Sequence, residues 1–225
     1  MAATDVDIEQ EVRLPADGAT LVGDLARPAA ARGVVLFAHG SGSSRHSPRN
    51  RAVARVLRSS GLATLLIDLL TRDEEAEDAA TGHLRFDIAL LARRLVAVTD
   101  WLRQEPATAR LPVGYFGAST GGGAALVAAA ERSEVFAVVS RGGRPDLAGP
   151  ALPRVSAPTL LIVGGDDVPV IAMNRAAAAR MRAEVRIEIV PGASHLFEEP
   201  GALERVAALA ARWFEDRLPP SADAS

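Results

Sequence analysis

The sequence predicts an α/β protein built on a doubly wound, mostly parallel sheet that begins with an antiparallel hairpin. Short, continuous apolar runs recur along the chain, as in strands that are covered on both faces. Helical segments lie between most of these runs, and a cluster of turn-forming residues at 15–18 divides the first two strands. Sheets of this kind bind ligands at the carboxyl ends of their strands, so functional residues are expected there.

The expected elements alternate from the hairpin onward. Strands are expected at residues 6–14, 20–25, 33–38, 62–67, 112–116, 135–139, 159–163 and 185–190. Helices are expected at residues 48–60, 84–102, 120–132, 169–181 and 199–218. The last strand alternates apolar and polar residues, which is typical of a sheet edge.

Three connecting features complete this outline. In the helix at 84–102, apolar residues recur every three or four positions, and Arg93 and Arg94 fall off that stripe. The acidic run at 73–78 is expected to be a solvated loop. The connection at 140–158 is short and rich in Gly and Pro, so we expect no lid domain and an open site.

Composition bounds the kind of protein. We expect one domain at residues 1–218 and a disordered polar tail at 219–225. The chain has no Cys, which excludes disulfides, a thiolate nucleophile and cysteine-based metal sites. The net charge is only -3, and the chain has neither a leader-like start nor a bilayer-length apolar run. We therefore expect a cytoplasmic protein that acts on a small molecule, not on nucleic acid or a membrane; the oligomeric state stays open.

The pentapeptide Gly-Ala-Ser-Thr-Gly at 117–121 follows an expected strand and precedes an apolar helix. This strand–turn–helix setting is what a nucleophile elbow needs, because the sharp turn lifts the hydroxyl of Ser119 above the sheet. A Gly-rich turn that cradles phosphate is the alternative, but no Lys and no dinucleotide-binding fingerprint accompanies it. We therefore predict that Ser119 is a nucleophile.

A serine nucleophile requires a general base, and the chain has four His residues. His195 lies in the loop between the last strand and the last helix, at the carboxyl end of a strand. His39 also ends a strand, but the Gly- and Ser-rich loop after it suits backbone donors better than proton transfer. His46 and His83 are expected to be surface residues. His195 is therefore the predicted base.

The third member of such a site is a carboxylate after another strand. Asp166 and Asp167 follow the same strand, and periodicity alone does not separate them. Asp146 is a third candidate. Asp68 precedes Ser119 in the chain, so a turn or capping role is expected for it.

An acyl-transfer site also needs donors for the oxyanion that forms on the substrate, and backbone N–H groups commonly supply them. One expected donor is the N–H of Thr120, at the start of the helix after the nucleophile, where the helix dipole helps. The other is expected from the loop at 39–42, from Ser41.

These phrases together resemble a known group. Residues 39–50 (HGSGSSRHSPRN), 115–121 (YFGASTG), 140–146 (SRGGRPD) and 192–199 (GASHLFEE) look like those of the dienelactone hydrolase-like branch of the α/β-hydrolase superfamily, over about residues 21–213. In that branch the acid stands three residues after the glycine that ends its strand, and counting from Gly164 implies Asp167. The resemblance implies the α/β-hydrolase fold and a cofactor-free, metal-free Ser119–His195–Asp167 triad.

The sequence departs from that branch at the nucleophile. Dienelactone hydrolase itself uses Cys, whereas this chain has Ser119 at the matching position. Similar chains also occur fused to a phosphoribosyltransferase domain. We expect a serine hydrolase of small carboxylic esters, thioesters or lactones; an acyltransferase and a catalytically silent binding scaffold are the alternatives.

Several residues near strand ends are candidates for substrate contact. Arg141 and Arg144 follow an expected strand and could bind a carboxylate or phosphate, or else brace their loop. The same two readings apply to Arg45, His46 and Arg49, which flank the loop of Ser41. Apolar candidates for an acyl pocket, or for the core, are Leu69, Leu70 and Phe197.

Overall fold

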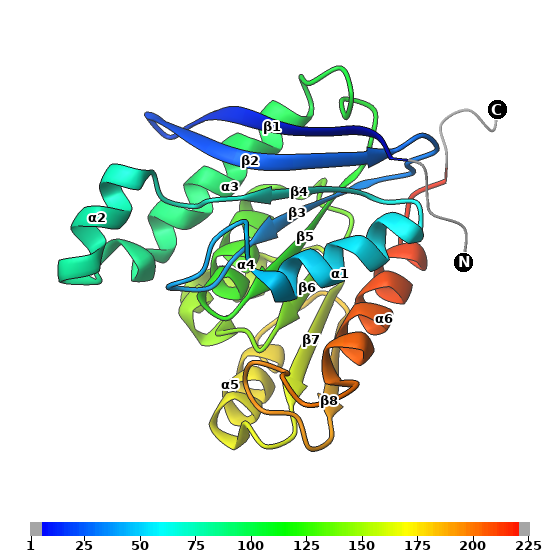
Figure 1. Cartoon of the computed structure of the whole chain (residues 1–225). Coiled ribbons are helices and arrows are strands. Elements are labelled where there is room, and N and C mark those ends of the chain that lie inside the picture. The colour runs from blue at the N-terminus through cyan, green and yellow to red at the C-terminus, as the bar shows by residue number, and fades with distance from the viewer. Residues whose placement is uncertain (1–5, 221–225) are drawn as a thin grey trace.

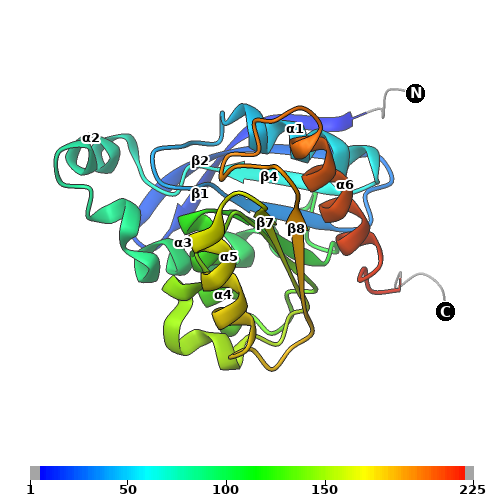
Figure 2. The same cartoon turned by 90° about the horizontal axis from the view of Figure 1, so that it is seen from below.

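A computed structural model describes residues 6–220 and consists of one eight-stranded sheet with helices on both faces (Figures 1 and 2). The strand order is β1-β2-β4-β3-β5-β6-β7-β8. The strands are β1 (Val6–Ala16), β2 (Ala19–Pro28), β3 (Val34–Ala38), β4 (Ala63–Ile67), β5 (Val113–Ala118), β6 (Val138–Arg141), β7 (Thr159–Gly164) and β8 (Val185–Val190). β1 pairs with β2, and β2 with β4, in antiparallel fashion. The remaining neighbours, from β4 through β3, β5, β6 and β7 to β8, all pair parallel. The predicted fold class, the N-terminal hairpin and the edge position of β8 are confirmed.

The helices follow the expected alternation. They are α1 (Pro48–Ser59), α2 (Arg72–Thr81), α3 (Ile88–Leu102), α4 (Thr120–Glu131), α5 (Val168–Ala178) and α6 (Ala202–Glu215), with short 3₁₀ segments η1 (Leu84–Phe86) and η2 (Pro145–Arg154). α1 and α6 cover one face of the sheet, and α3, α4 and α5 cover the other (Figure 2). Because β3, β5, β6, β7 and β8 run parallel, the loops that follow them all lie at the carboxyl ends of the strands.

The hairpin turn is tighter than predicted. β1 continues through Pro15, which pairs with Thr20, and the turn consists of Asp17 and Gly18 alone. Both turn residues have positive φ, 49° and 78°, as a two-residue turn between twisted strands requires. Pro15 is tolerated because β1 is an edge strand.

The prediction of a loop at 73–78 was wrong, because these residues lie in α2. The helix begins with a capping box, in which Thr71 accepts from the N–H of Glu74 and the Glu74 carboxylate accepts from the N–H of Thr71. Acidic residues in its first turn face the positive end of the helix dipole. α2 lies beyond the carboxyl end of β4 (Figure 1).

Arg94, which falls off the apolar stripe of α3, is buried with only 2% exposure. Its guanidinium donates to the carbonyl of Leu69 and to both oxygens of Glu74. This bidentate pair joins α3 to α2 and to the chain just after β4. Sequence periodicity does not reveal it, because the partner lies 20 residues away.

β6 also lies further along the chain than predicted, since it includes Ser140 and Arg141. Both side chains are buried, and polar residues at the end of a central strand resemble a loop in the sequence. The shift makes Arg141 the last residue of β6.

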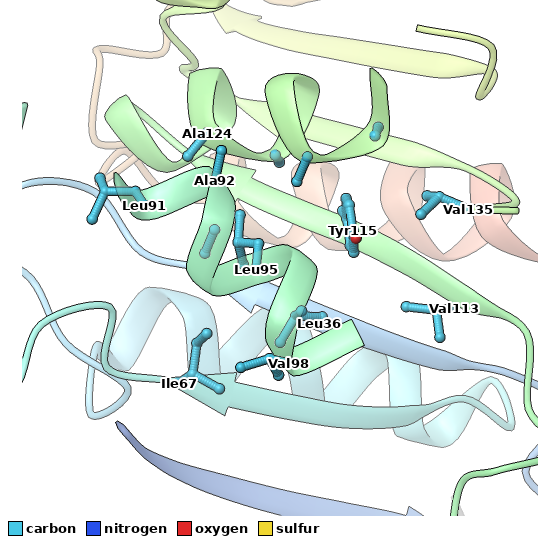
Figure 3. Close-up of a cluster of buried hydrophobic side chains, with 14 of the residues drawn as sticks. Leu36, Ile67, Leu91, Ala92, Leu95, Val98, Val113, Tyr115, Ala124 and Val135 are labelled. Atoms are coloured by element: carbon cyan, nitrogen blue, oxygen red, sulfur yellow. The ribbon is translucent and has the colours of Figure 1, made fainter. Parts of the chain in front are cut away.

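The core has two layers, one on each face of the sheet. On the α3 and α4 side, Leu36 and Tyr115 pack with Leu95 and Val98 of α3 (Figure 3). The buried Tyr115 hydroxyl is paired with Thr99 at 2.6 Å. On the other side, Phe37 and Phe116 stack with ring centroids 4.8 Å apart, under α1 and α6.

Two predictions concern the chain ends and membranes. The tail predicted to be disordered lies partly outside the described residues, and Pro219 and Pro220 belong to no helix or strand. Among residues 6–220, none of the helices is both long and apolar enough to cross a bilayer.

Candidate active site

Ser119 occupies a strained turn between β5 and α4. Its φ is 49° and its ψ is −120°, a conformation that non-glycine residues adopt at appreciable cost. The backbone around it is tied down: its N–H donates to the carbonyl of Arg141 at 3.2 Å, and its carbonyl accepts from Gly122 and Arg144. The strand–turn–helix geometry expected around Ser119 is present.

The glycines of the pentapeptide permit close backbone approach. A Cβ added to Gly117 would lie 2.5 Å from the carbonyl oxygen of Gly121, and one added to Gly121 would lie 2.2 Å from the carbonyl oxygen of Ala38. Any side chain at these positions would push α4 away from β3 and β5. They therefore fix the height of Ser119 above the sheet.

His195 and Asp167 are directly joined. The Nδ1–H of His195 donates to Oδ2 of Asp167 over 2.6 Å. Within residues 6–220 no hydrogen bond involves Nε2 of this ring, and the side chain is 39% exposed. Asp166 is exposed and uses its backbone N–H to bind the carbonyl of Ala193. Of the two neighbouring aspartates, Asp167 is the one in contact with His195.

Gly142 lies next to His195 and follows Arg141, whose carbonyl binds the N–H of Ser119. A Cβ on Gly142 would lie 3.5 Å from Cε1 of His195. In the described part of the chain no hydrogen bond joins the Ser119 hydroxyl to the imidazole. Ser119 and His195 thus follow different strands, β5 and β8, at the same end of the sheet, without a direct hydrogen bond.

The loop after β3 lies against the start of α4. A Cβ on Gly40 would lie 3.0 Å from Cβ of Ser119, and the N–H of Ser41 donates to Oγ1 of Thr120 at 2.9 Å. The N–H of Ser41 therefore has a side-chain acceptor, and the bond joins residues 79 positions apart in the sequence.

His39 at the end of β3 has both ring nitrogens occupied. Nδ1–H donates to the carbonyl of Gly40, and Nε2 accepts from the N–H of Leu69 at 3.1 Å. Burial lowers the pKa of His39, which favours the neutral ring that this pattern needs. His39 holds the loop to the chain after β4, whereas His46 and His83 are exposed.

A cavity of about 580 Å³ opens beside Thr120. Leu69, Leu70 and Leu91 give it apolar walls, and the loop after β3 and the start of α1 border it. α2 and η1 contribute Glu75, Asp78 and Arg85, which are further lining residues. Phe197 does not line this cavity; it is buried on the α1 and α6 side of the sheet, where its ring lies 3.4 Å from the position that a Cβ on Gly142 would take.

The lining residues from α2 were missed because the acidic run was interpreted as a loop. The pattern Thr71-x-x-Glu74 is a capping-box signature and could have indicated the helix. Within α2, the carboxylate of Asp78 is buried and accepts hydrogen bonds from the backbone N–H groups of Leu84 and Arg85. In residues 6–220 no group of three or more His, Cys, Asp or Glu is placed to hold a metal ion.

A comparison with known protein families shows to which family the chain belongs. The profile of the dienelactone hydrolase family matches residues 21–218. The chain belongs to the dienelactone hydrolase family. Its structure is similar to that of a dienelactone hydrolase from Anabaena variabilis, with 64% identity, a TM-score of 0.92, and coverage of 94% of this chain and 99% of that one.

Two further proteins are similar to this chain, one in sequence and one in fold. A protein from two strains of Mycobacterium tuberculosis, provisionally named a phosphoribosyl transferase, is 58% identical over 96% of this chain and 48% of its own length. The chain thus spans about half of these curated relatives. A cold-adapted esterase from an Arctic intertidal metagenomic library has the same fold, with a TM-score of 0.76, 19% identity and 94% of each chain covered. Family and neighbours support a hydrolase.

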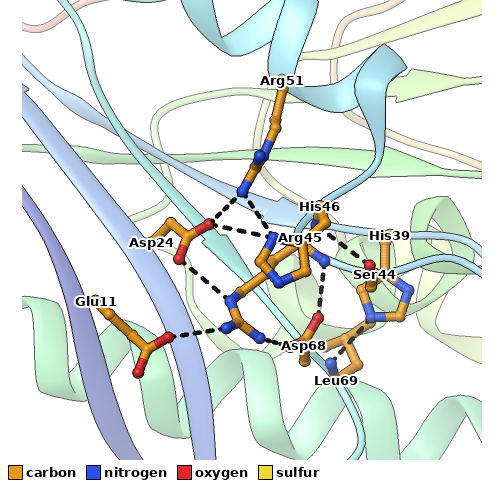
Figure 4. A network of polar contacts seen from close by, with 9 residues as sticks. All are labelled: Glu11, Asp24, His39, Ser44, Arg45, His46, Arg51, Asp68 and Leu69. Atoms are coloured by element: carbon orange, nitrogen blue, oxygen red, sulfur yellow. Dashed lines mark hydrogen bonds and ion pairs between the residues drawn. The ribbon is translucent and has the colours of Figure 1, made fainter.

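The arginines near the site of this dienelactone hydrolase family member differ in their partners. Arg45 donates to Glu11, Asp24 and Asp68, and so fastens the loop after β3 to β1, β2 and the end of β4 (Figure 4). Arg144 makes two hydrogen bonds to Asp146. Their guanidinium groups are therefore engaged by carboxylates, whereas the guanidinium of Arg141 is not.

Proposed function

We propose that this chain is a serine hydrolase of small carboxylic esters, working through an acyl-enzyme without a cofactor. One observation carries the proposal: the 2.6 Å hydrogen bond between His195 Nδ1 and Asp167 Oδ2. It orients the imidazole so that Nε2 is the nitrogen available as a base. Ser119 stands at the same strand ends, in the strained turn described above.

In the first half of the proposed reaction, the Ser119 oxygen attacks the ester carbonyl and Nε2 of His195 takes the hydroxyl proton. The ring closes on the hydroxyl when substrate binds, since catalytic hydrogen bonds are often long before that step. The tetrahedral intermediate then expels the alcohol, which receives the proton from Nε2. Asp167 stabilises the imidazolium throughout and keeps its own charge.

In the second half, water attacks the acyl group on Ser119 and gives a proton to the same Nε2. Collapse of the second intermediate releases the carboxylic acid and returns the proton to Ser119. A thioester or a lactone would follow the same steps, with a thiol or the ring oxygen as leaving group.

The proposed oxyanion donors are the N–H groups of Thr120 and Ser41. Thr120 is the first residue of α4, so its N–H lies at the positive end of the helix. The bond from Ser41 to Oγ1 of Thr120 holds the second donor next to the first. When the oxyanion forms, it competes with Oγ1 for the Ser41 N–H, as a charged acceptor attracts the donor more strongly.

The cavity supports a small substrate with an apolar part. Its volume, about 580 Å³, is that of an ordinary small-molecule site. We propose that Leu70 and its neighbour Leu69 contact the acyl or alcohol part. The phosphoribosyl transferase name belongs to proteins about twice as long, and we propose that it refers to their other half.

Hydrolysis of p-nitrophenyl esters of increasing acyl length tests the proposal. We expect turnover that is highest for short acyl chains and is lost in Ser119→Ala. Ser133→Ala, at an exposed position beyond the far end of α4, is the matched control and should keep the parent rates. Equal turnover by Ser119→Ala and the parent, or no turnover of any ester, would contradict it.

A further inference from the structure

β8 ends the sheet with an open edge. It is the outermost strand, at the edge opposite β1, and it pairs on one side only, with β7 (Figure 1). The carbonyls of Glu184 and Val190 accept hydrogen bonds from the β7 side. Alternate residues of a strand direct their backbone groups to the same side, so Val185, Ile187 and Ile189 direct theirs outward. Within residues 6–220, no turn or loop hydrogen bond engages the backbone of these three outward residues.

The side chains of β8 are sorted by kind between the two faces of the sheet. Val190 packs in the core beneath α1 and α6, so Arg186 and Glu188 lie on that face. Arg186 has a side chain that is 64% exposed, and its Nε donates to Glu188 over 2.6 Å. The three outward residues lie on the opposite face, are all apolar, and are only partly buried. The edge thus carries an apolar row on one face and two opposite charges on the other.

The order of these side chains is the same in kind from either end, with Ile187 at the centre. An apolar residue stands two positions away on each side, and the two residues next to Ile187 have opposite charges. A second copy of β8, placed antiparallel about a two-fold axis at Ile187, therefore meets a compatible strand. Arg186 would lie opposite the partner's Glu188, Val185 opposite the partner's Ile189, and Ile187 opposite the partner's Ile187. Cross-strand pairs of opposite charge and of β-branched residues are both favourable.

Charge also selects this register over its neighbours. An axis moved to Arg186 would place that residue opposite the partner's Arg186. An axis moved to Glu188 would place two carboxylates opposite each other in the same way. Like charges directly opposite are destabilising, so the axis at Ile187 is the favoured one. In that register the outward residues pair with one another, and their free N–H and carbonyl groups can bond across the axis.

We propose that β8 is a dimerisation edge, at which two copies of this chain pair antiparallel through residues 185–189 and join their sheets into one. The two-fold axis repeats each cross-strand pair, so every favourable contact counts twice. Pairing also covers an edge that would otherwise be open to unspecific strand addition. Five residues a side make a small interface, so we expect a Kd in the micromolar range. This dimer does not depend on the proposed ester hydrolysis.

A charge swap tests the pairing. In sedimentation velocity, the parent should pass from monomer to dimer as its concentration rises through the micromolar range. Arg186→Glu places like charges opposite each other at two positions, so it should raise the dimer Kd by about tenfold or more. The double variant Arg186→Glu, Glu188→Arg restores opposite charges and should return the Kd to the parent value. Arg13→Glu makes the same reversal at an exposed position of β1, the other edge strand, and should keep the parent Kd.

Hydrogen exchange shows whether β8 is the strand that pairs. The outward N–H groups of residues 185–189 should exchange more slowly in concentrated than in dilute parent, and Arg186→Glu should remove that difference. A parent that stays monomeric throughout would overturn the proposal. So would a dimer that Arg186→Glu does not weaken, one that Arg13→Glu weakens equally, or a folded double variant no tighter than Arg186→Glu.

Discussion

His195 binds Asp167 and not the adjacent Asp166: the Nδ1–Oδ2 distance is 2.6 Å, while the carboxylate of Asp166 is on the surface. The two aspartates follow the same strand and differ by one position, so their exchange for Asn is a closely matched comparison. We expect Asp167→Asn to lower kcat for p-nitrophenyl esters by about 10³- to 10⁴-fold, because the amide would favour the wrong tautomer of His195. Asp166→Asn should stay within about threefold of the parent, since it touches no part of the proposed machinery. The opposite ranking in a steady-state assay would move the acid to Asp166.

The hydroxyl of Thr120 offers a second test, on the oxyanion loop. Thr120→Val keeps the shape of the side chain and removes the acceptor of the Ser41 N–H, whereas Thr120→Ser keeps the acceptor. We expect Thr120→Val to lower kcat about tenfold or more with little change in KM, because the N–H of Ser41, the second oxyanion donor, loses the hydrogen bond that positions it. Ser should retain most of the parent kcat. Equal kcat values for the Val and Ser variants would show that this bond does not position the loop.

The ion pair between α2 and α3 should matter for stability. Arg94 is buried, so Glu74→Ala would leave a cation without its carboxylate and is expected to cost about 3 kcal/mol in urea denaturation. The double variant Glu74→Ala, Arg94→Met should recover part of that loss.

The control for this pair is another Arg–Glu pair that is exposed. Glu134→Ala removes the partner of Arg103, whose side chain is 57% exposed, and should change the free energy of unfolding by less than about 1 kcal/mol. Similar losses for Glu74→Ala and Glu134→Ala would mean that burial of Arg94 does not set the cost.

His39 should make the folded state sensitive to mild acid. Its pKa is lowered from 6.5 by burial, so as the pH falls below about 6.5 the unfolded chain takes up a proton at this position before the folded chain does. Stability therefore falls with pH, by at most about 1.4 kcal/mol per unit from this group. His39→Gln should show a shallower decline between pH 7 and pH 5.5 in urea titrations. An identical slope in the two proteins would contradict a titrating His39.

Much of the framework could be predicted from the sequence. Apolar runs and helical periodicity identify every strand of the sheet, and they put Ser119, Asp167 and His195 after three different strands. What periodicity could not supply was the choice between Asp166 and Asp167, since neighbours on a loop have the same pattern. That choice came from the family spacing after Gly164, and the contact with His195 agrees with it.

The remaining differences have a common physical cause, which is contact between distant residues. α2 has few apolar residues, and its buried partner Arg94 lies 20 positions away. The bond between Ser41 and Thr120 spans 79 positions. Arg141 resembled a surface residue in the sequence, whereas the folded chain leaves it only 7% exposed. Such long-range pairs leave no local pattern.

The central claim is that Ser119 is an activated nucleophile, and labelling with a fluorophosphonate tests it most directly. A serine activated by His195 attacks the phosphorus and keeps the adduct, which intact-mass spectrometry detects as a fixed increase. Ser133→Ala is the control that should label like the parent. The account predicts one adduct on the parent and none on Ser119→Ala; an unlabelled parent, or equal labelling of Ser119→Ala, would contradict it.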